Sequence, residues 1–347
     1  MRPARSGAKA PGGREGEQGA GLSMPETGGR GVKEAWAMGG VKIVVALLLW
    51  AGLCWGASGA GAQDWGATVI FSRGDTLWRT DLRGSSPEPV GPGYDGEISP
   101  GGDRVAFTEY DEEGRRYIAV RDLKSREVWR VPGIEGENSY GPRWSPDGTA
   151  LLFNHWWEEG SRWVIATIRP EGTEGRIFSG VGSEDLFSPF WGGGGTEVFA
   201  QDLTFLYRFD LEGRLLDRRP VEEVVGDRGI SSATRFSVAP DGKTWLFDAL
   251  ATTSRDRALA ARVGDAVSAA FVYAEGTKEV RRISPPGVAV SGACWAPGGR
   301  VLLAGFEEKD VRKGKEGPQI AFRLLLLSGD RVIGLAEDAL APSCALK

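Results

Sequence analysis

The sequence is poor in histidine and in cysteine. Its 347 residues include one histidine, His155, and three cysteines. A site that needs two imidazole ligands is therefore excluded, and with it the common histidine-based zinc centres. A Ser–His triad would have to use His155, and no G-x-S-x-G motif, which carries the nucleophile of many hydrolases, occurs beyond residue 62. We predict no catalytic residues, no cofactor and no metal site.

An excess of positive charge is also missing. The chain has 42 basic and 47 acidic residues, a formal net charge of −5. Residues 1–63 hold seven of the basic and four of the acidic residues, so the remainder carries a net charge of −8. Nucleic-acid binding needs a positive field, and so does docking on anionic lipid by charge alone. We predict no nucleic-acid partner.

No apolar run in the sequence is long enough to cross a membrane. The run Ile43–Trp55 has 13 residues, whereas a membrane-spanning helix needs about 20. A lysine precedes it, and a stretch of small residues follows that ends at Ala60 and Ala62. A basic start, a short apolar run and an A-x-A site predict a secretory signal peptide within residues 1–62.

The signal peptide also predicts where the mature chain begins. Cleavage after Ala62 would make Gln63 its first residue. A signal peptide that starts at Met38 would have 25 residues, an ordinary length. Residues 1–37 would then lie upstream of the true translation start.

Export predicts the compartment of the mature chain, residues 63–347. We expect a periplasmic or secreted bacterial protein with no stable membrane span. The alternative is a lipoprotein anchored through Cys54. It ranks second because Leu53 is not the small residue that such an anchor site requires.

Glycine, in contrast, is abundant. The 52 glycines are about twice the usual share, which disfavours long helices and suits short strands joined by tight turns. One pattern recurs: an aromatic or apolar residue, a small residue, Pro, Asp or Gly, then Gly and an apolar strand. The copies are Ile98–Gly102, Trp144–Gly148, a degenerate Trp191–Gly195, Val238–Gly242 and Trp295–Gly299.

The spacing of these copies predicts the architecture. Their first residues are 46, 47, 47 and 57 positions apart, and a period near 45 with short strands is typical of propeller blades of four strands each. We call the strands A to D from the channel outward. Pro and Asp-Gly favour a tight turn, which would join strand A to strand B and let the leading residue wedge between blades. The expected strands of the clearest segments are Ala67–Ser72, Thr76–Leu82, Pro87–Val90, Arg104–Thr108, Tyr117–Arg121, Glu127–Val131, Leu151–Asn154, Trp163–Ile168, Arg176–Phe178, Gln319–Leu327 and Arg331–Glu337.

The two ends of the propeller predict how the ring closes. The first three strands match B, C and D of a blade that lacks strand A, and residues 338–347 are long enough to supply it. Five full repeats and one split blade make an all-β, six-bladed propeller, and closure removes sheet edges that would aggregate. The longest interval between copies of the motif, from Val238 to Trp295, holds extra residues near 251–266. Within it, Ser254–Val263 would form a short helix in a B–C loop.

The recurring Trp-Ser-Pro-Asp-Gly motif, followed by an apolar-aromatic strand, resembles the TolB-type, WD40-like propeller repeat over roughly residues 66–347. That family is associated with exported bacterial propellers of the Tol–Pal envelope system. The resemblance implies a propeller fold and is compatible with several functions, because similar repeats occur in sugar lyases and in propeller domains of peptidases. We expect only the signal segment ahead of the propeller, without the α/β domain that the resemblance implies there, so we do not predict a role in the Tol–Pal complex.

Several polar or reactive residues have simpler interpretations than a site. We interpret Gly192–Gly195 as a degenerate hairpin turn. A phosphate loop would have to be followed by a helix, and no helix is expected after Gly195. Asp147 and Asp241 belong to turns, and His155 is expected in a loop or at a solvent-exposed edge. Two cysteines remain after cleavage. Cys294 and Cys344 either form a disulfide that staples the ring, with Cys344 at the equivalent position of the next inner strand, or stay as two buried thiols.

The strand directions place the D–A and B–C connections on one rim and the short A–B turns on the other. We predict that the D–A/B–C rim is the working face, because it carries aromatic side chains amid charge, whereas the A–B rim offers little that would grip a partner. The predicted binding residues are Tyr94, Asp95, Tyr140, Trp156, Trp157, Glu158, Phe187 and Arg235.

These observations predict a monomeric, non-catalytic platform that binds a protein partner in the cell envelope. The alternative is a carbohydrate-binding or carbohydrate-cleaving propeller that uses carboxylates at the channel mouth, since glycosidases need two carboxylates about 5–10 Å apart.

Overall fold

The computed structural model describes residues 65–347 except 180, 181, 183, 316, 330 and 347. The described residues belong to the second of two units into which the chain divides, residues 59–347. The predicted signal peptide, its cleavage site at Ala60, Ala62 and Gln63, and the alternative anchor Cys54 lie outside the described residues.

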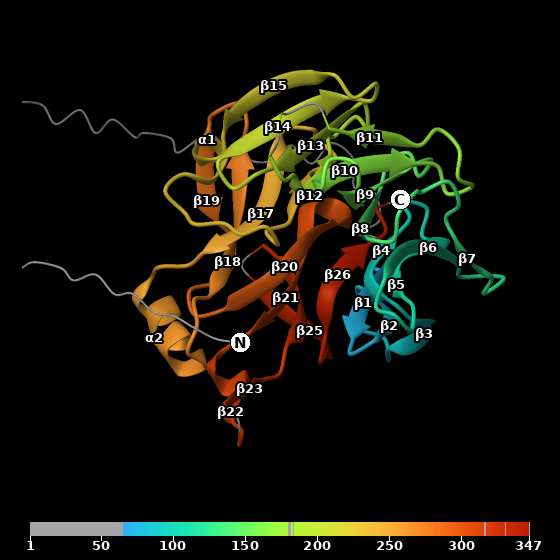
Figure 1. The fold of residues 1–347 in the computed structure, drawn as a ribbon. Coiled ribbons are helices and arrows are strands. Elements are labelled where there is room, and N and C mark those ends of the chain that lie inside the picture. The colour runs from blue at the N-terminus through green and yellow to red at the C-terminus, as the bar shows by residue number, and fades with distance from the viewer. Residues whose placement is uncertain (1–64, 180–181, 183, 316, 330, 347) are drawn as a thin grey trace, which may run out of the picture. The chain divides into compact units, whose positions relative to one another are not determined.

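The described strands form six antiparallel blades of four strands, so the predicted six-bladed propeller is confirmed (Figure 1). From strand A to strand D, blade 1 is β26 (Leu340–Cys344), β1 (Thr68–Arg73), β2 (Thr76–Asp81) and β3 (Glu88–Pro92). Blade 2 is β4 (Tyr94–Ile98), β5 (Arg104–Tyr110), β6 (Arg116–Asp122) and β7 (Val128–Arg130). Blade 3 is β8 (Ser139–Trp144), β9 (Leu151–Trp157), β10 (Arg162–Ile168) and β11 (Arg176–Phe178).

The remaining blades follow in chain order. Blade 4 is β12 (Phe187–Trp191), β13 (Glu197–Gln201), β14 (Phe205–Asp210) and β15 (Leu215–Pro220). Blade 5 is β16 (Phe236–Val238), β17 (Thr244–Leu250), β18 (Ser268–Ala274) and β19 (Glu279–Arg282). Blade 6 is β20 (Ala289–Ala296), β21 (Arg300–Phe306), β24 (Arg323–Ser328) and β25 (Arg331–Glu337). Short helical elements are α1 (Glu222–Val225), α2 (Ser254–Val263), η1 (Pro297–Gly299) and η2 (Glu308–Asp310).

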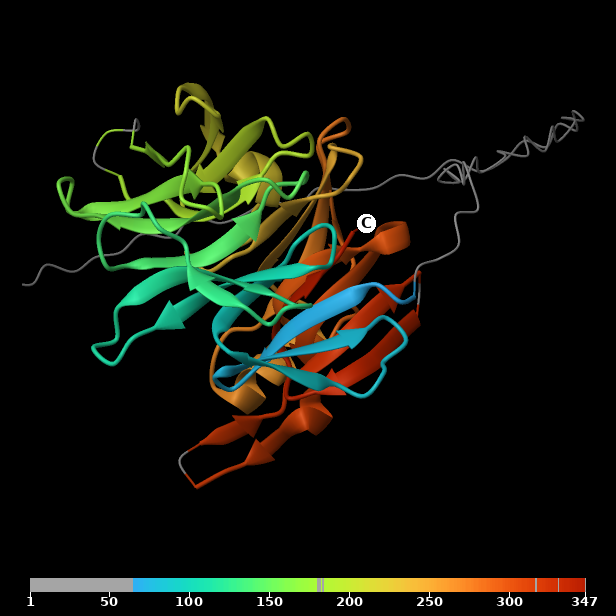
Figure 2. The ribbon, with the colours of Figure 1, turned by 90° about the vertical axis from the view of Figure 1, so that its right-hand side faces the viewer.

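Blade 1 is split between the two ends of the propeller, as predicted. The last strand, β26, pairs antiparallel with β1, and Val69 lies opposite Cys344. Figure 2 shows the blue and cyan strands of blade 1 beside the red strands near the C-terminus. The inner strands contact one another in the order β26, β4, β8, β12, β16, and β20 contacts β17 and β26, so the ring is closed.

The repeated motif forms the A–B turn. In blade 3, the amide of Gly148 donates to the carbonyl of Ser145 at 2.8 Å, and Gly148 has a φ of 78°. Asp147 accepts from the amide of Thr149 at 3.0 Å, and Asp241 holds its own turn in the same way. The interpretation of both aspartates as turn residues is confirmed, because each carboxylate accepts a hydrogen bond from a nearby backbone amide.

The leading tryptophans tie adjacent blades together. The indole nitrogen of Trp144 donates to the backbone carbonyl of Glu97 in the preceding inner strand at 3.0 Å. Trp191 donates to the carbonyl of Arg143 at 3.1 Å, and Trp295 to that of Ser237 at 3.3 Å. The rings are buried, so each tryptophan fills the gap between two sheets while satisfying its one polar atom. The predicted wedge is confirmed.

Five inner strands share an irregularity that the repeat pattern does not announce. The pairing with strand B shifts register near the middle of β4, β8, β12, β20 and β26. Each shift contains a residue with positive φ, such as Asp95 at 51°, Gly141 at 66° and Ser188 at 50°. Bulges of this kind bend a strand and change the direction of its side chains, and Asp95, Gly141 and Ser188 border one cavity.

Two insertions extend the B–C connections of blades 5 and 6. The predicted helix is confirmed as α2, with a capping box between Thr253 and Asp256. The single strand expected at Gln319–Leu327 is wrong. Its first part, β23 (Pro318–Ile320), pairs with β22 (Val311–Lys313) in a separate hairpin, and only β24 continues the blade. The helix and the hairpin share one apolar cluster that includes Leu259, Phe306 and Val311.

The position expected for His155 is also wrong. His155 lies within β9 and is 4% exposed, with Nδ1 2.9 Å from the hydroxyl of Ser139. Strand β9 extends three residues further than its apolar start suggested, and this extension brings the imidazole into the core. Burial lowers the pKa of His155, which favours a neutral structural ring.

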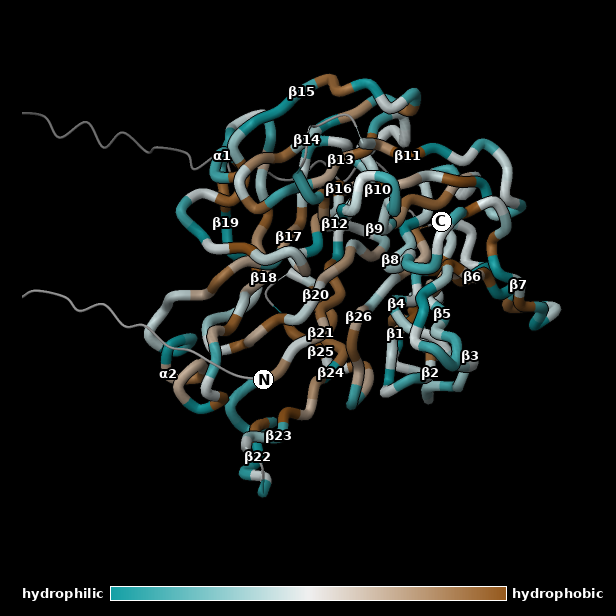
Figure 3. Tube along the Cα trace, in the orientation of Figure 1, coloured by the Kyte–Doolittle hydropathy of each residue, from teal (hydrophilic) through white to brown (hydrophobic). Residues whose placement is uncertain are grey.

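Hydrophobic residues follow the strands, and hydrophilic residues predominate in the turns (Figure 3). Among the described residues, no helix is long and apolar enough to cross a membrane.

Candidate functional site

The inner strands surround a channel with two different ends. At the D–A end, a cavity of about 150 Å³ is bounded by polar side chains, including Asp95, Tyr140 and Arg235. At the A–B end, a wider cavity of about 340 Å³ is bounded mainly by aromatic and apolar side chains. We call these the polar mouth and the apolar mouth. Arg143 borders both, and its guanidinium lies 3.1 Å from a carboxylate oxygen of Glu97.

The polar mouth brings together three of the predicted binding residues. Arg235, just before β16, lies 3.0 Å from the carboxylate of Asp95 on the far side of the ring. Tyr140 borders the same cavity. Asp248, on β17, accepts a hydrogen bond from the backbone amide of Arg235 at 2.9 Å. Burial raises the pKa of Asp248 to about 6, because it removes water from around the charged carboxylate.

The raised pKa of Asp248 predicts a pH-dependent loss of stability. The folded state holds this proton more tightly than the unfolded state, so the destabilisation is absent below about pH 4 and complete above about pH 7. A rise of about two units corresponds to roughly 3 kcal/mol. We expect Asp248→Asn, which can still accept from the Arg235 amide, to raise the free energy of unfolding by about 2–3 kcal/mol at pH 8 and to have little effect at pH 4. Denaturant unfolding at both pH values measures this, and an equal effect at both would contradict it.

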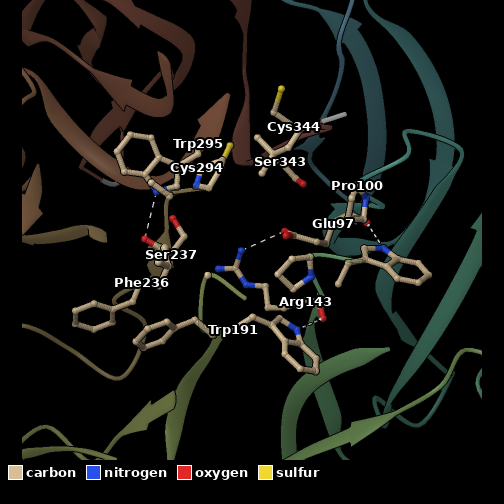
Figure 4. Close-up of a pocket in the computed structure, with 18 of the residues that line it drawn as sticks. Glu97, Pro100, Arg143, Trp191, Phe236, Ser237, Cys294, Trp295, Ser343 and Cys344 are labelled. Carbon is tan, nitrogen blue, oxygen red and sulfur yellow. Dashed lines mark hydrogen bonds and ion pairs between the residues drawn. The ribbon is translucent and has the colours of Figure 1, made fainter. Parts of the chain in front are cut away.

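The apolar mouth was not predicted. Its wall contains the leading residues of all five repeats, namely Ile98, Trp144, Trp191, Val238 and Trp295. Figure 4 shows Trp191, Phe236 and Trp295 around this cavity, with Arg143 and Glu97 joined across it. The A–B rim therefore carries an aromatic and apolar cavity that was not anticipated from the sequence, and the choice of the D–A/B–C rim as the working face stays a prediction. The sequence signal was the repeat itself, because each leading residue lies at or next to the end of an inner strand, where it borders this cavity.

Beside the polar mouth, blades 2 and 3 form an aromatic cluster around an arginine. The guanidinium carbon of Arg116 lies 4.1 Å from the ring centre of Tyr140 and 5.2 Å from that of Trp163. Trp163 packs edge-on against both Tyr140 and Trp156, at 5.2 and 5.5 Å between ring centres. The Arg116 Nε donates to Asn138 at 2.6 Å, which fixes its plane. We call Arg116, Tyr140, Trp156 and Trp163 the rim cluster.

The rim cluster borders a groove with mixed charge. The groove has a volume of about 540 Å³ and runs past Tyr110, Arg115 and Glu158. Arg115 pairs with three carboxylates, from Asp111, Glu113 and Glu137, so its charge is neutralised locally. Glu158 is exposed, and Tyr110 is 47% exposed. The rim thus combines exposed aromatic surface with acidic side chains.

The other predicted binding residues lie on the same rim with different roles. Tyr94 begins β4, is 39% exposed and packs edge-on against Tyr110 at 4.9 Å. Trp157 ends β9 and lies against Gly160, where a Cβ would come within 2.2 Å of its ring. Phe187 begins β12 and is half-buried. The structure places these residues in strand ends, whereas the sequence assigned them to connections.

Sequence reasoning missed Arg116, Trp163 and Asp248. The first two are found by pairing the B–C hairpins: Tyr110 lies opposite Arg116, and Trp156 lies opposite Trp163. An aromatic residue near the end of strand B therefore indicates that the residue opposite it, near the start of strand C, also lies on this rim.

The two cysteines are not at equivalent positions. Cys344, opposite Val69, occupies the place of Trp295, which lies opposite Val301, whereas Cys294 comes one residue earlier. Since successive side chains of a strand point to opposite faces, this offset turns the thiols in different directions. The expected equivalence is wrong, and both residues are buried thiols in the structure. Burial raises the pKa of Cys294 well above its usual value.

Within the described part of the chain, no group of three or more His, Cys, Asp or Glu side chains is arranged to hold a metal ion.

The fold is similar to that of solved TolB structures. TolB from Acinetobacter baumannii matches with a TM-score of 0.58 and 15% identity over 82% of this chain and 68% of that one. A chain assigned as TolB from Agrobacterium tumefaciens matches with a TM-score of 0.53 and 14% identity, over 78% and 88% of the two chains. A chain of the nidogen/laminin complex matches with a TM-score of 0.54 and 8% identity, over 81% and 99%.

No model of a known protein family matches the chain, and no curated protein matches it. At these identities the structural similarity concerns the fold. The class of protein is therefore a six-bladed β-propeller that resembles TolB in architecture.

Proposed function

We propose that the chain is an exported, non-catalytic propeller that binds a protein partner in the cell envelope through its D–A/B–C rim. The observation that carries the proposal is the rim cluster. Its arginine is held between aromatic rings, and its neighbours Tyr94 and Tyr110 are exposed. Aromatic and arginine side chains dominate the energetics of protein interfaces, and a cluster that is already ordered loses little entropy on binding.

The charge of the rim indicates the character of the partner. Exposed acids, among them Glu112, Glu113, Glu158 and Glu159, surround the rim cluster on blades 2 and 3. A basic surface would be attracted to this part of the rim, with an association rate that falls as salt rises. The nidogen/laminin complex contains a chain of similar fold, which supports a role of such propellers in protein recognition.

A carbohydrate-directed propeller is the second candidate, and the observation that favours it is a pair of carboxylates, Asp95 at the polar mouth and Asp248 beside Arg235. Asp95 is already paired with Arg235, and Asp248 accepts from a backbone amide. Asp95 is therefore neutralised by Arg235, whereas the raised pKa of Asp248 is a property that a general acid needs. Turnover of a cell-wall glycan or polyuronate by the purified protein would establish this candidate and overturn the non-catalytic proposal.

The experiment that tests the protein-binding proposal is site-specific photo-cross-linking in the intact envelope. A photoreactive benzophenone amino acid replaces Glu158 on the D–A/B–C rim, and in a second protein it replaces Asp241, an exposed residue of an A–B turn. We expect a discrete protein adduct from position 158 and none from position 241. Adducts from position 241 alone would show that the other face binds.

Export itself gives a separate prediction. We expect N-terminal sequencing of the protein recovered from the envelope to begin at Gln63, because Ala60 and Ala62 form the cleavage site. A mature form that keeps residues 43–55 would contradict the signal-peptide assignment. A lipid-modified N-terminus at Cys54 would establish the lipoprotein alternative.

A further inference from the structure

A second groove opens on the same rim, over blades 5 and 6. It has a volume of about 690 Å³ and lies between α2 and the segment around η2. Four residues of α2 border it, and their spacing is i, i+3, i+4 and i+7: Arg255, Ala258, Leu259 and Arg262. This spacing puts them on one face of the helix, with the two arginines two turns, or roughly 10 Å, apart.

Interactions on the inner side of the helix fix this face in place. The side chain of Asp256 is 1% exposed and accepts from Arg282 at 3.0 Å and from the amide of Gly287 at 3.0 Å. A Cβ at Gly287 would lie 3.4 Å from that of Arg255, so the glycine lets the chain pass close to the helix. The groove is therefore ordered before any ligand enters it, which reduces the entropy lost on binding.

The groove carries cations without carboxylate partners. Arg255 and Arg262 are exposed and form no ion pair with any described residue. On the opposite wall, Glu307 is neutralised by Lys309 and Arg323, each at 2.6 Å, and Glu308 is exposed. Beyond it, β22 adds two exposed cations, Arg312 and Lys313. The rim is thus basic over blades 5 and 6, although the chain as a whole carries a net charge of −5.

The floor of the groove is apolar. Leu259 is 3% exposed, and Ala258 and Pro286 lie beside it. An occupant therefore needs carboxylates for the two arginines and an apolar side chain for the space between them. A flat lipid surface would meet the arginines without filling the groove, whereas an extended polypeptide satisfies both requirements.

We propose that the α2 groove binds an extended acidic segment of a partner protein, with an apolar side chain on Leu259 and carboxylates on Arg255 and Arg262. The proposal rests on the proposed function, because it assigns a second contact on the same rim. A partner that bridges both sites would present a basic surface to blades 2 and 3 and an acidic segment to blades 5 and 6. The charge pattern would then fix its orientation.

The test uses a fluorescein-labelled decapeptide of alternating Glu and Leu, and fluorescence anisotropy with the exported protein. We expect saturable binding that weakens as salt rises. Arg262→Glu is expected to weaken it at least tenfold. The matched control is Arg257→Glu, which makes the same charge change on an exposed residue of α2 that does not border the groove, and we expect less than a threefold effect. Unchanged circular dichroism spectra of both variants exclude unfolding.

Other outcomes overturn the proposal. Absence of saturable peptide binding overturns it, as does an equal loss from Arg257→Glu and Arg262→Glu. Equal affinity for a peptide of alternating Glu and Ser would show that the apolar floor has no role. Binding to phosphatidylglycerol vesicles without peptide binding would assign the cations to a membrane. If the peptide does not bind but position 158 still gives a cross-link, only this inference is refuted. If the peptide binds but position 158 gives no cross-link, only the proposed function is refuted.

Discussion

Removal of residues 338–347 is expected to abolish the cooperative unfolding transition of the propeller. The deletion takes away β26, the inner strand of blade 1, and with it the pairing to β1. The hydroxyl of Ser343 also accepts from the amide of Ile98 at 3.0 Å, which joins blade 1 to blade 2. Because β26 contacts β20 as well as β4, its loss opens the ring on both sides.

We expect the deletion to cost more than about 5 kcal/mol, the lower end of the stability of a whole domain. Calorimetry and denaturant unfolding measure the loss. The control is a chain without residues 346 and 347 only, because Leu346 is exposed and follows the last strand. If the longer deletion melted at the same temperature as the control, closure through β26 would be refuted.

The second large effect is expected from Trp144→Ala. Its ring is 5% exposed and packs in the apolar cluster between blades 2 and 3, and its indole nitrogen holds the carbonyl of Glu97. Loss of a buried tryptophan costs about 3–5 kcal/mol. At about 2 °C per kcal/mol for a domain of this size, the melting temperature should fall by roughly 6–10 °C.

A matched variant separates packing from hydrogen bonding. Trp144→Phe keeps an aromatic ring and removes the donor, so we expect a loss of only about 1–2 kcal/mol. A melting temperature unaffected by Trp144→Ala would show that the wedge does not stabilise the blade interface. An equal loss from both variants would assign the stabilisation to the hydrogen bond instead of the ring.

The period of the sequence predicted the blades because each Pro-Asp-Gly or Pro-Gly-Gly turn acts locally. The turn itself requires a positive φ at Gly148, independently of the rest of the fold. The apolar strand that follows the turn then pairs with the strand that precedes it. The split blade followed from the same count. The hairpin of β22 and β23 was missed for two reasons. Strand β22 lies in the expected loop, and β23 overlaps the start of the single strand expected at Gln319–Leu327. Both strands are short and polar, so they lack the alternation of apolar residues that indicates a strand.

The site depended on contacts between blades, which a repeat pattern does not encode. Asp95 meets Arg235 across the channel, 140 residues away, and the bulge at Asp95 sets the direction of its side chain. The positions of Cys344 and Cys294 on their inner strands differ by one residue. The sequence did not define the last strand to within one residue, so this offset was not predicted. Residue types on the rim were predictable, whereas the partners of each side chain were not.

The most direct test of the central claim is the dissociation constant for the partner identified by cross-linking, measured with purified proteins. We expect Tyr140→Ala and Trp156→Ala each to weaken binding by about 30-fold or more, the effect of an interface hot spot of at least about 2 kcal/mol. The control, Leu346→Ala at the apolar mouth, should bind as the wild type does. If both rim variants fold and bind normally while Leu346→Ala loses affinity, the partner binds the apolar mouth and the assigned face is wrong.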